Sequence, residues 1–80
     1  MRNLKKLRKE RRLTQIAIKI ETGIDQSLLS KYEHGERIPS TNDLIVLADF
    51  FKTNIDYLLD RTDVSDPLPP KKANDESEKE

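Results

Sequence analysis

Hydrogen-bonding side chains recur at a helical spacing within residues 14–35 of this 80-residue chain. Gln26, Ser27, Ser30 and Lys31 are spaced so that an α-helix would present them on one open side. Carboxamide, hydroxyl and ammonium groups are the chemistry that reads base edges in the major groove of B-DNA. The pattern therefore predicts a surface that binds double-stranded DNA.

Other chemistries are not supported. The chain has no cysteine and a single histidine, His34, so neither a thiolate nor an imidazole metal site is expected. We find no nucleophile–base pair and no phosphate-binding loop, so no enzyme activity and no cofactor are predicted. No apolar run approaches the ~20 residues of a membrane span, and no greasy stretch follows the basic N-terminus. We expect a cytoplasmic protein that does not bind membranes.

Two short helices must position the polar face. Thr14 is a suitable N-cap for a helix from Gln15 to about residue 21, which Gly23 ends. Asp25 opens a second helix, residues 26–33, which is closed by Gly35. The β-branched run at residues 16–20 alternates in a partly strand-like way, but it has no partner strand. We therefore expect a helix, a tight turn and a protruding second helix.

The remaining elements complete an all-α bundle of five helices over residues 1–60. Asn3 is expected to cap a first helix that runs towards Arg11, and Ser40 with Asp43 forms a capping-box variant for a fourth helix. Asn54 is expected to cap a short fifth helix. Residues 61–80 contain three prolines and few apolar residues, so we expect a flexible charged tail, serving solubility or docking a protein partner.

Charge is distributed unevenly although the net charge is zero. Residues 1–37 carry ten basic and five acidic side chains, a net charge of +5, whereas residues 38–60 carry a net charge of −3. A basic segment of this kind favours a polyanionic partner.

Several fragments, in order, resemble the helix-turn-helix domain of the phage repressors and Cro, the Xre-type regulators. The resemblance covers about residues 2–60 and rests on Leu7-Arg8, Leu13-Thr14-Gln15, Gly23-Ile24, Ser30-Lys31-Tyr32-Glu33 before Gly35, Ile38-Pro39-Ser40 and Ile55-Asp56-Tyr57-Leu58-Leu59. The sequence departs from that family at Lys19 and Thr22, where alanine and an aliphatic residue are usual. It also departs at Ile16 and Ile20, which are usually polar.

The resemblance implies roles for individual residues. Gln15 would hold a phosphate and clamp Gln26 against an adenine, and Ser27, Lys31 and Ser30 would face neighbouring bases or phosphates. Arg8 and Glu33 would form a structural ion pair between the first and third helices. Backbone contacts are expected from residues near the helix starts and loops: Thr14, Arg12, Arg37, Ser40, Thr41 and Asn42.

The function expected from these features is sequence-specific DNA binding by a small transcriptional regulator, most simply a repressor. One domain covers few base pairs, so a homodimer on a pseudo-palindromic site is expected, formed largely on DNA. Its surface would come from Ile55, Leu58, Leu59 and Phe51. An antitoxin, a restriction–modification controller and a protein-interaction module with the same fold are the alternatives.

Overall fold

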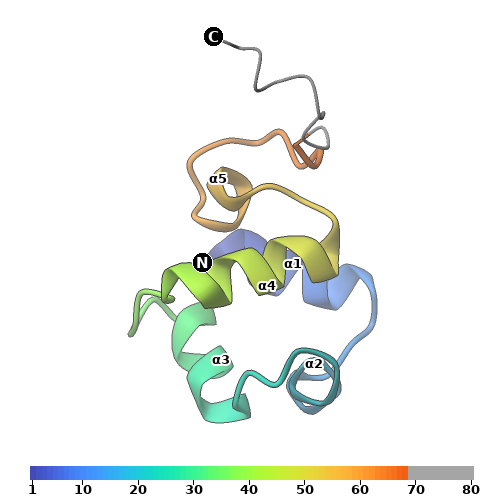
Figure 1. Cartoon of the computed structure of the whole chain (residues 1–80), viewed down its shortest axis with the longest axis vertical. Helices are drawn as coiled ribbons and strands as arrows, with labels where there is room; N and C mark the ends of the chain where they lie inside the picture. The colour runs from blue at the N-terminus through green and yellow to red at the C-terminus, as the bar shows by residue number, and fades with distance from the viewer. Residues whose placement is uncertain (69–80) are drawn as a thin grey trace, which may run out of the picture.

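The computed structural model describes residues 1–68, and within that range its helices are joined by turns and loops, with no β-strand. Its five helices are α1 (Arg2–Glu10), α2 (Gln15–Thr22), α3 (Gln26–Glu33), α4 (Thr41–Phe51) and α5 (Ile55–Leu58). The predicted fold class is confirmed, and the run at residues 16–20 is helical. Figure 1 shows α2 and α3 at the end of the molecule that faces away from α5.

Side-chain caps from residues nearby in the sequence explain most helix starts. The hydroxyl of Thr14 accepts from the Ala17 amide, and the Asn54 carboxamide oxygen accepts from the Tyr57 amide. Ser40 accepts from the amide of Asp43 at the start of α4, as predicted. Each of these bonds satisfies a backbone donor that the first helical turn leaves free.

The start of α1 differs from the prediction. Asn3 lies inside α1, which begins at Arg2, and the Asn3 carboxamide donates to the Tyr57 carbonyl oxygen over 2.8 Å. The cap is supplied from the other end of the domain instead, because the Asp60 carboxylate accepts from the amides of Arg2 and Asn3, both at 2.8 Å. Burial alone would raise the pKa of Asp60, but these two amides hold it below its usual value.

Arg11, directly after α1, reaches the end of α4. Its guanidinium donates to the carbonyl oxygens of Phe50 at 3.3 Å and Phe51 at 2.7 Å, and it lies 5.2 Å from the centre of the Phe51 ring. A cation at these positions satisfies the free carbonyls at the end of α4 and complements its dipole. Arg11 therefore ties α1 to α4.

One core holds the helices together. Its buried apolar residues are Leu4, Leu7, Ile18, Ile24, Leu29, Tyr32, Leu47, Ala48, Phe51, Tyr57 and Leu58. Two residues expected on a dimer surface are thus core residues: Phe51 is 1% exposed and Leu58 is 0% exposed. The reason is that α5 packs on both α1 and α4, which bury its apolar side within the chain. Ile55 and Leu59 remain half-buried.

The first residues of the expected tail are attached to the domain. The Thr53 hydroxyl donates to the Ser65 carbonyl oxygen at 2.7 Å. The Asn54 carboxamide donates to the carbonyl oxygens of Val64 at 2.9 Å and Asp66 at 2.8 Å. Residues 64–66, inside the range expected to form the flexible tail, are therefore hydrogen-bonded to the start of α5. The rest of that tail prediction lies outside the described residues.

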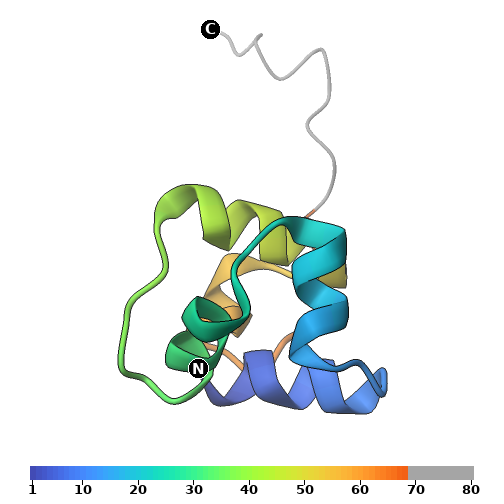
Figure 2. The ribbon, with the colours of Figure 1, turned by 90° about the horizontal axis from the view of Figure 1, so that it is seen from below.

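The helices are arranged so that α2 and α3 share one end of the core. Seen from below in Figure 2, α1 and α4 lie on opposite sides of the α2–α3 pair. α2 packs on α3 and on α4, and α1 packs on α3 and α5. Within residues 1–68 no helix has the length and apolar character needed to cross a membrane.

Candidate nucleic-acid interface

The turn between α2 and α3 is built by three residues. Gly23 ends α2 in the left-handed conformation, with φ at +80°, and its amide donates to the Lys19 carbonyl oxygen over 2.8 Å. The Thr22 hydroxyl donates to the carbonyl oxygen of Ile18 at 2.8 Å and accepts from the Ile24 amide at 3.2 Å. A threonine at this position thus uses its hydroxyl to fasten the turn. The turn fixes the angle at which α3 leaves α2.

The outward face of α3 carries the residues predicted to read bases. Gln26, Ser27 and Lys31 are exposed and Ser30 is half-buried, whereas the opposite side of the same helix is buried. Ser27 is partly engaged, since its hydroxyl and its amide both donate to the Asp25 carboxylate at the helix start. These bonds lower the pKa of Asp25. The face is polar and free of large apolar groups.

Four side chains form a continuous network, which we call the polar relay: Arg8, Glu33, Gln15 and Gln26. The Arg8 guanidinium donates to Glu33 twice, from Nε to Oε2 at 2.6 Å and from Nη2 to Oε1 at 3.0 Å. Gln15 Nε2 donates to Glu33 Oε1 at 3.1 Å, and Gln26 Nε2 donates to Gln15 Oε1 at 3.4 Å. The structure therefore links the core between α1 and α3 to the outward face of α3.

The Arg8–Glu33 pair is the anchored end of the polar relay. The Glu33 side chain is 1% exposed and that of Arg8 is 14% exposed. Arg8 also donates to the Leu13 carbonyl oxygen at 3.0 Å. The hydrogen bond with Glu33 raises the pKa of Arg8. This bidentate geometry holds both side chains in one orientation.

A second polar contact places the start of α4 beside α3. The Tyr32 hydroxyl donates to the Asp43 carboxylate over 2.5 Å. Burial, followed by this bond to Asp43, raises the pKa of Tyr32 to about 12, so the phenol stays protonated at neutral pH. The contact holds the first turn of α4, which contains or adjoins Ser40, Thr41 and Asn42, against α3.

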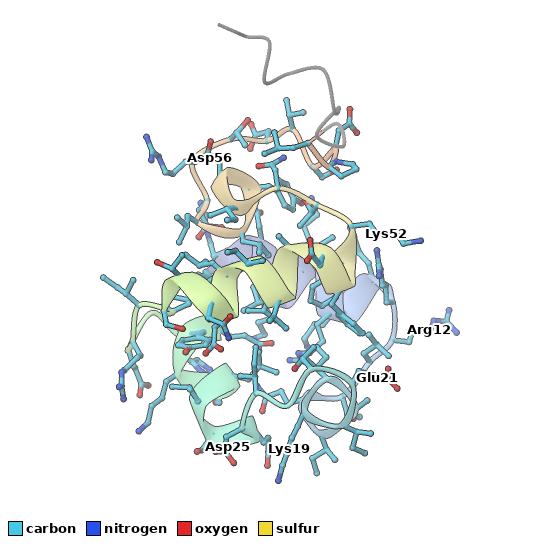
Figure 3. The ribbon with its side chains drawn as sticks, in the orientation of Figure 1. Arg12, Lys19, Glu21, Asp25, Lys52 and Asp56 are labelled. Atoms are coloured by element: carbon cyan, nitrogen blue, oxygen red, sulfur yellow. The ribbon has the colours of Figure 1, made fainter. Side chains whose placement is uncertain are left out.

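All six residues predicted to contact the DNA backbone, apart from Gln15, are accessible to solvent. Thr14, Arg12, Arg37, Ser40, Thr41 and Asn42 are all exposed. Thr14 and Ser40 are also helix caps, and Arg12 adopts a left-handed backbone, with φ at +57°, in the turn after α1. Figure 3 shows Arg12 projecting from that turn, Lys19 and Asp25 at the α2–α3 end, and Asp56 on the opposite side.

Two apolar side chains also face solvent on α2, where Ile16 is 54% exposed and Ile20 is 75% exposed. Neither belongs to the core. Lys19, between them, is exposed too. The outer side of α2 is therefore more apolar than the face of α3.

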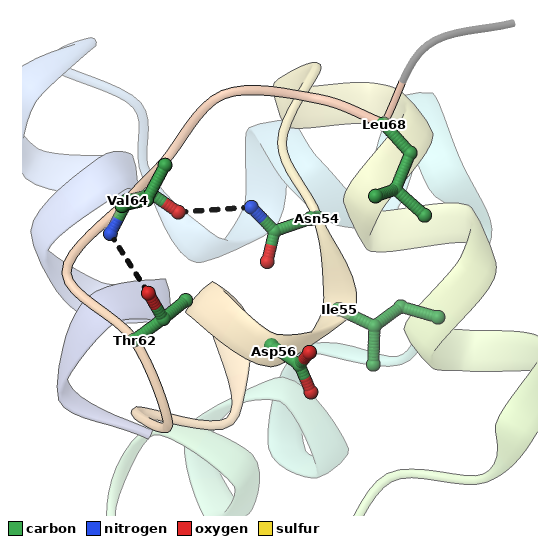
Figure 4. Close-up of a pocket in the computed structure, with 6 residues that line it drawn as sticks. All are labelled: Asn54, Ile55, Asp56, Thr62, Val64 and Leu68. Carbon is green, nitrogen blue, oxygen red and sulfur yellow. Dashed lines mark hydrogen bonds between the residues drawn. The ribbon is translucent and has the colours of Figure 1, made fainter.

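The opposite end of the domain holds a shallow cavity of about 300 Å³. It is lined by Asn54, Ile55, Asp56, Thr62, Val64 and Leu68. Figure 4 shows the bond from Asn54 to Val64 and the bond from the Val64 amide to the Thr62 hydroxyl, which hold its wall in place. This surface, with Ile55 and the half-buried Leu59 nearby, is what remains of the predicted dimer surface.

Sequence reasoning missed the contact between Glu33 and Gln15. The motif indicated the pairs Arg8–Glu33 and Gln15–Gln26 separately, and no spacing rule joins residues 15 and 33. His34, the C-cap of α3, is exposed, and its ring Nδ1 lies 2.8 Å from the Ser30 carbonyl oxygen.

This arrangement of α2, turn and exposed α3 defines a helix-turn-helix protein, and comparison with known sequences agrees. The chain belongs to the helix-turn-helix domain family, whose match covers residues 1–64. No solved structure matches the chain at a significant level.

Two relatives come from Bacillus subtilis (strain 168). The chain is 33% identical over 69 residues to the uncharacterized HTH-type transcriptional regulator YobD, covering 86% of this chain and 62% of the relative. It is 39% identical over 57 residues to the uncharacterized HTH-type transcriptional regulator YqaE, covering 71% of this chain and 49% of the relative. The chain thus spans about half to three-fifths of the length of these relatives.

Proposed function

We propose that this chain is a transcriptional regulator of the Xre/Cro type that binds double-stranded DNA with α3 in the major groove. The observation that carries the proposal is the outward face of α3, where an exposed carboxamide, Gln26, is held by Gln15 and flanked by Ser27 and Lys31. A carboxamide offers one acceptor and one donor, which match N6 and N7 of adenine. The relatives named as transcriptional regulators support the same conclusion.

The charge distribution supports DNA over a protein as the ligand of this face. The basic segment, residues 1–37, contains all of α1, α2 and α3. A module that keeps the fold to bind protein would present an apolar or acidic face on α3, and α3 presents neither. Exposed donors at the start of α4 add groups suited to phosphate.

We further propose that the chain acts as a repressor and as a homodimer on two half-sites about one helical turn, roughly 34–36 Å, apart. Ile55 and Leu59 are the apolar residues left for such an interface after the burial of Phe51 and Leu58. An interface of this extent would fall below the ~1,200 Å² of standard stable pairs, so dimers should form largely on DNA.

The test begins by selecting bound duplexes from a random pool with the wild-type chain. Gln26→Ala should weaken binding to the selected duplex by about 1–3 kcal/mol and change binding to random duplex little. Arg12→Ala, the matched control, should weaken both about equally. The logarithm of the binding constant should fall linearly with the logarithm of the salt concentration. The slope should be about −7 for a dimer that makes ~4 phosphate contacts per subunit. Binding that is indifferent to salt, or absence of any selected sequence, would refute the proposal.

A further inference from the structure

We infer that Glu33 is a positioning residue for base recognition, because its carboxylate sets the direction of the hydrogen bonds in the polar relay and so orients the Gln26 carboxamide. The inference rests on the proposed DNA-binding function. It assigns a role in sequence discrimination to a buried residue that does not touch DNA.

The buried end of the polar relay is the carboxylate of Glu33. An ionised carboxylate only accepts hydrogen bonds. Glu33 Oε1 accepts from Arg8 at 3.0 Å and from Gln15 at 3.1 Å, and its side chain is 1% exposed. Gln15 must therefore turn its amino group towards Glu33. A flipped amide would place two acceptors against each other in a site with little access to water.

The orientation of Gln15 in turn fixes the orientation of Gln26 at the surface. With its amino group on Glu33, Gln15 presents Oε1 to Gln26, whose Nε2 lies 3.4 Å away. Gln26 must then donate one N–H to Gln15. It keeps Oε1 and its second N–H for a ligand, which is the acceptor–donor pair complementary to adenine.

Without Glu33, nothing would fix which end of each glutamine carboxamide points towards its neighbour. The two ends of a carboxamide have nearly the same shape, so only the hydrogen-bond network decides which end faces which way. If Glu33 no longer demanded a donor, both glutamines would be free to turn. Gln26 would then also be able to present two N–H groups to guanine, whose O6 and N7 are both acceptors. Affinity would change less than the preference for adenine.

The test measures base discrimination by the full 80-residue chain. The first probe is the duplex that the wild-type chain selects from a random pool. The other three carry the alternative base pairs at one position, namely the position where Gln26→Ala loses the wild-type preference. The wild-type ratio of Kd values is expected to be roughly 5–150-fold, the value of one bidentate contact. Glu33→Gln should reduce this ratio to near the Gln26→Ala value while binding to random duplex persists.

Two further variants separate positioning from stability. Gln15→Met breaks the polar relay but keeps the Arg8–Glu33 pair, so it should also lose discrimination, and a Gln15→Met protein that keeps the wild-type ratio would overturn the inference even if Glu33→Gln does not fold. Leu47→Ala weakens the core where Leu47 is 0% exposed and should lower Tm with the ratio unchanged.

A Glu33→Gln protein that keeps the wild-type ratio would overturn the inference and leave the proposed function standing. An equal loss of the ratio in Leu47→Ala would overturn it as well. Failure of the wild-type chain to select any sequence would instead refute the proposed function.

Discussion

Breaking the Arg8–Glu33 pair from either side should destabilise the fold unequally, because the two partners differ in burial. Arg8→Ala strands a carboxylate that is 1% exposed and keeps only the Gln15 donor. The cost of a stranded buried charge is about 3–5 kcal/mol. Glu33→Ala strands a guanidinium that is 14% exposed and still donates to the Leu13 carbonyl oxygen, so we expect about 2–3 kcal/mol.

These losses are large for a domain whose total stability should be on the order of 3–10 kcal/mol. The double variant strands no charge, so it should lose no more than Arg8→Ala alone. Urea unfolding followed by far-UV circular dichroism gives the three free energies and the coupling, expected at about 2–3 kcal/mol. Strictly additive losses would show that the pair contributes nothing as a pair, and a larger loss in Glu33→Ala would contradict the burial argument.

Four further predictions concern other parts of the fold. Asp60→Asn should cost about 1 kcal/mol, because a carboxamide can accept only one of the two hydrogen bonds from the amides of Arg2 and Asn3. The pKa of Asp60 is lowered in the folded state, so its contribution to the free energy of unfolding is present above the ordinary aspartate pKa and is lost as pH falls through the folded pKa. The free energy of unfolding of Asp60→Asn should therefore depend less on pH in acid than that of the wild type. Tyr32→Phe should lower the free energy of unfolding by about 2 kcal/mol. The wild type should lose stability as pH rises from about 10 to about 12, because the pKa of Tyr32 is raised to about 12 in the folded state, and the variant should not show this loss. Gly23→Ala should cost about 1–2 kcal/mol from backbone strain at φ +80° alone, since a Cβ there meets nothing within 4 Å; a thermal melt unchanged from wild type would contradict this. Leu59→Glu should weaken binding to the selected duplex and reduce the two-protomer complex in sedimentation, and unchanged affinity would exclude this surface as the dimer interface.

The sequence by itself was sufficient for features that depend on neighbours within about four residues. Thr14, Ser40 and Asn54 cap helices as predicted, and Gly23 ends α2 in the left-handed conformation. The side of α3 that carries Gln26 also follows from helical periodicity. In these cases donor and acceptor are joined by a short stretch of backbone, so their spacing along the chain settles their geometry.

Only the tertiary structure decided contacts between residues far apart in the chain. Asp60 caps α1 across 58 residues, Arg11 caps α4 across 40, and Glu33 meets Gln15 across 18. The prediction of Asn3 as a cap was wrong because a stronger acceptor arrives from the end of α5. Leu58 was assigned to a surface because a short helix presents apolar residues on more than one side, and Phe51, the last residue of α4, was assigned to the same surface. The packing of α5 against α1 and α4 determines which of those sides is covered, and no local pattern encodes that packing.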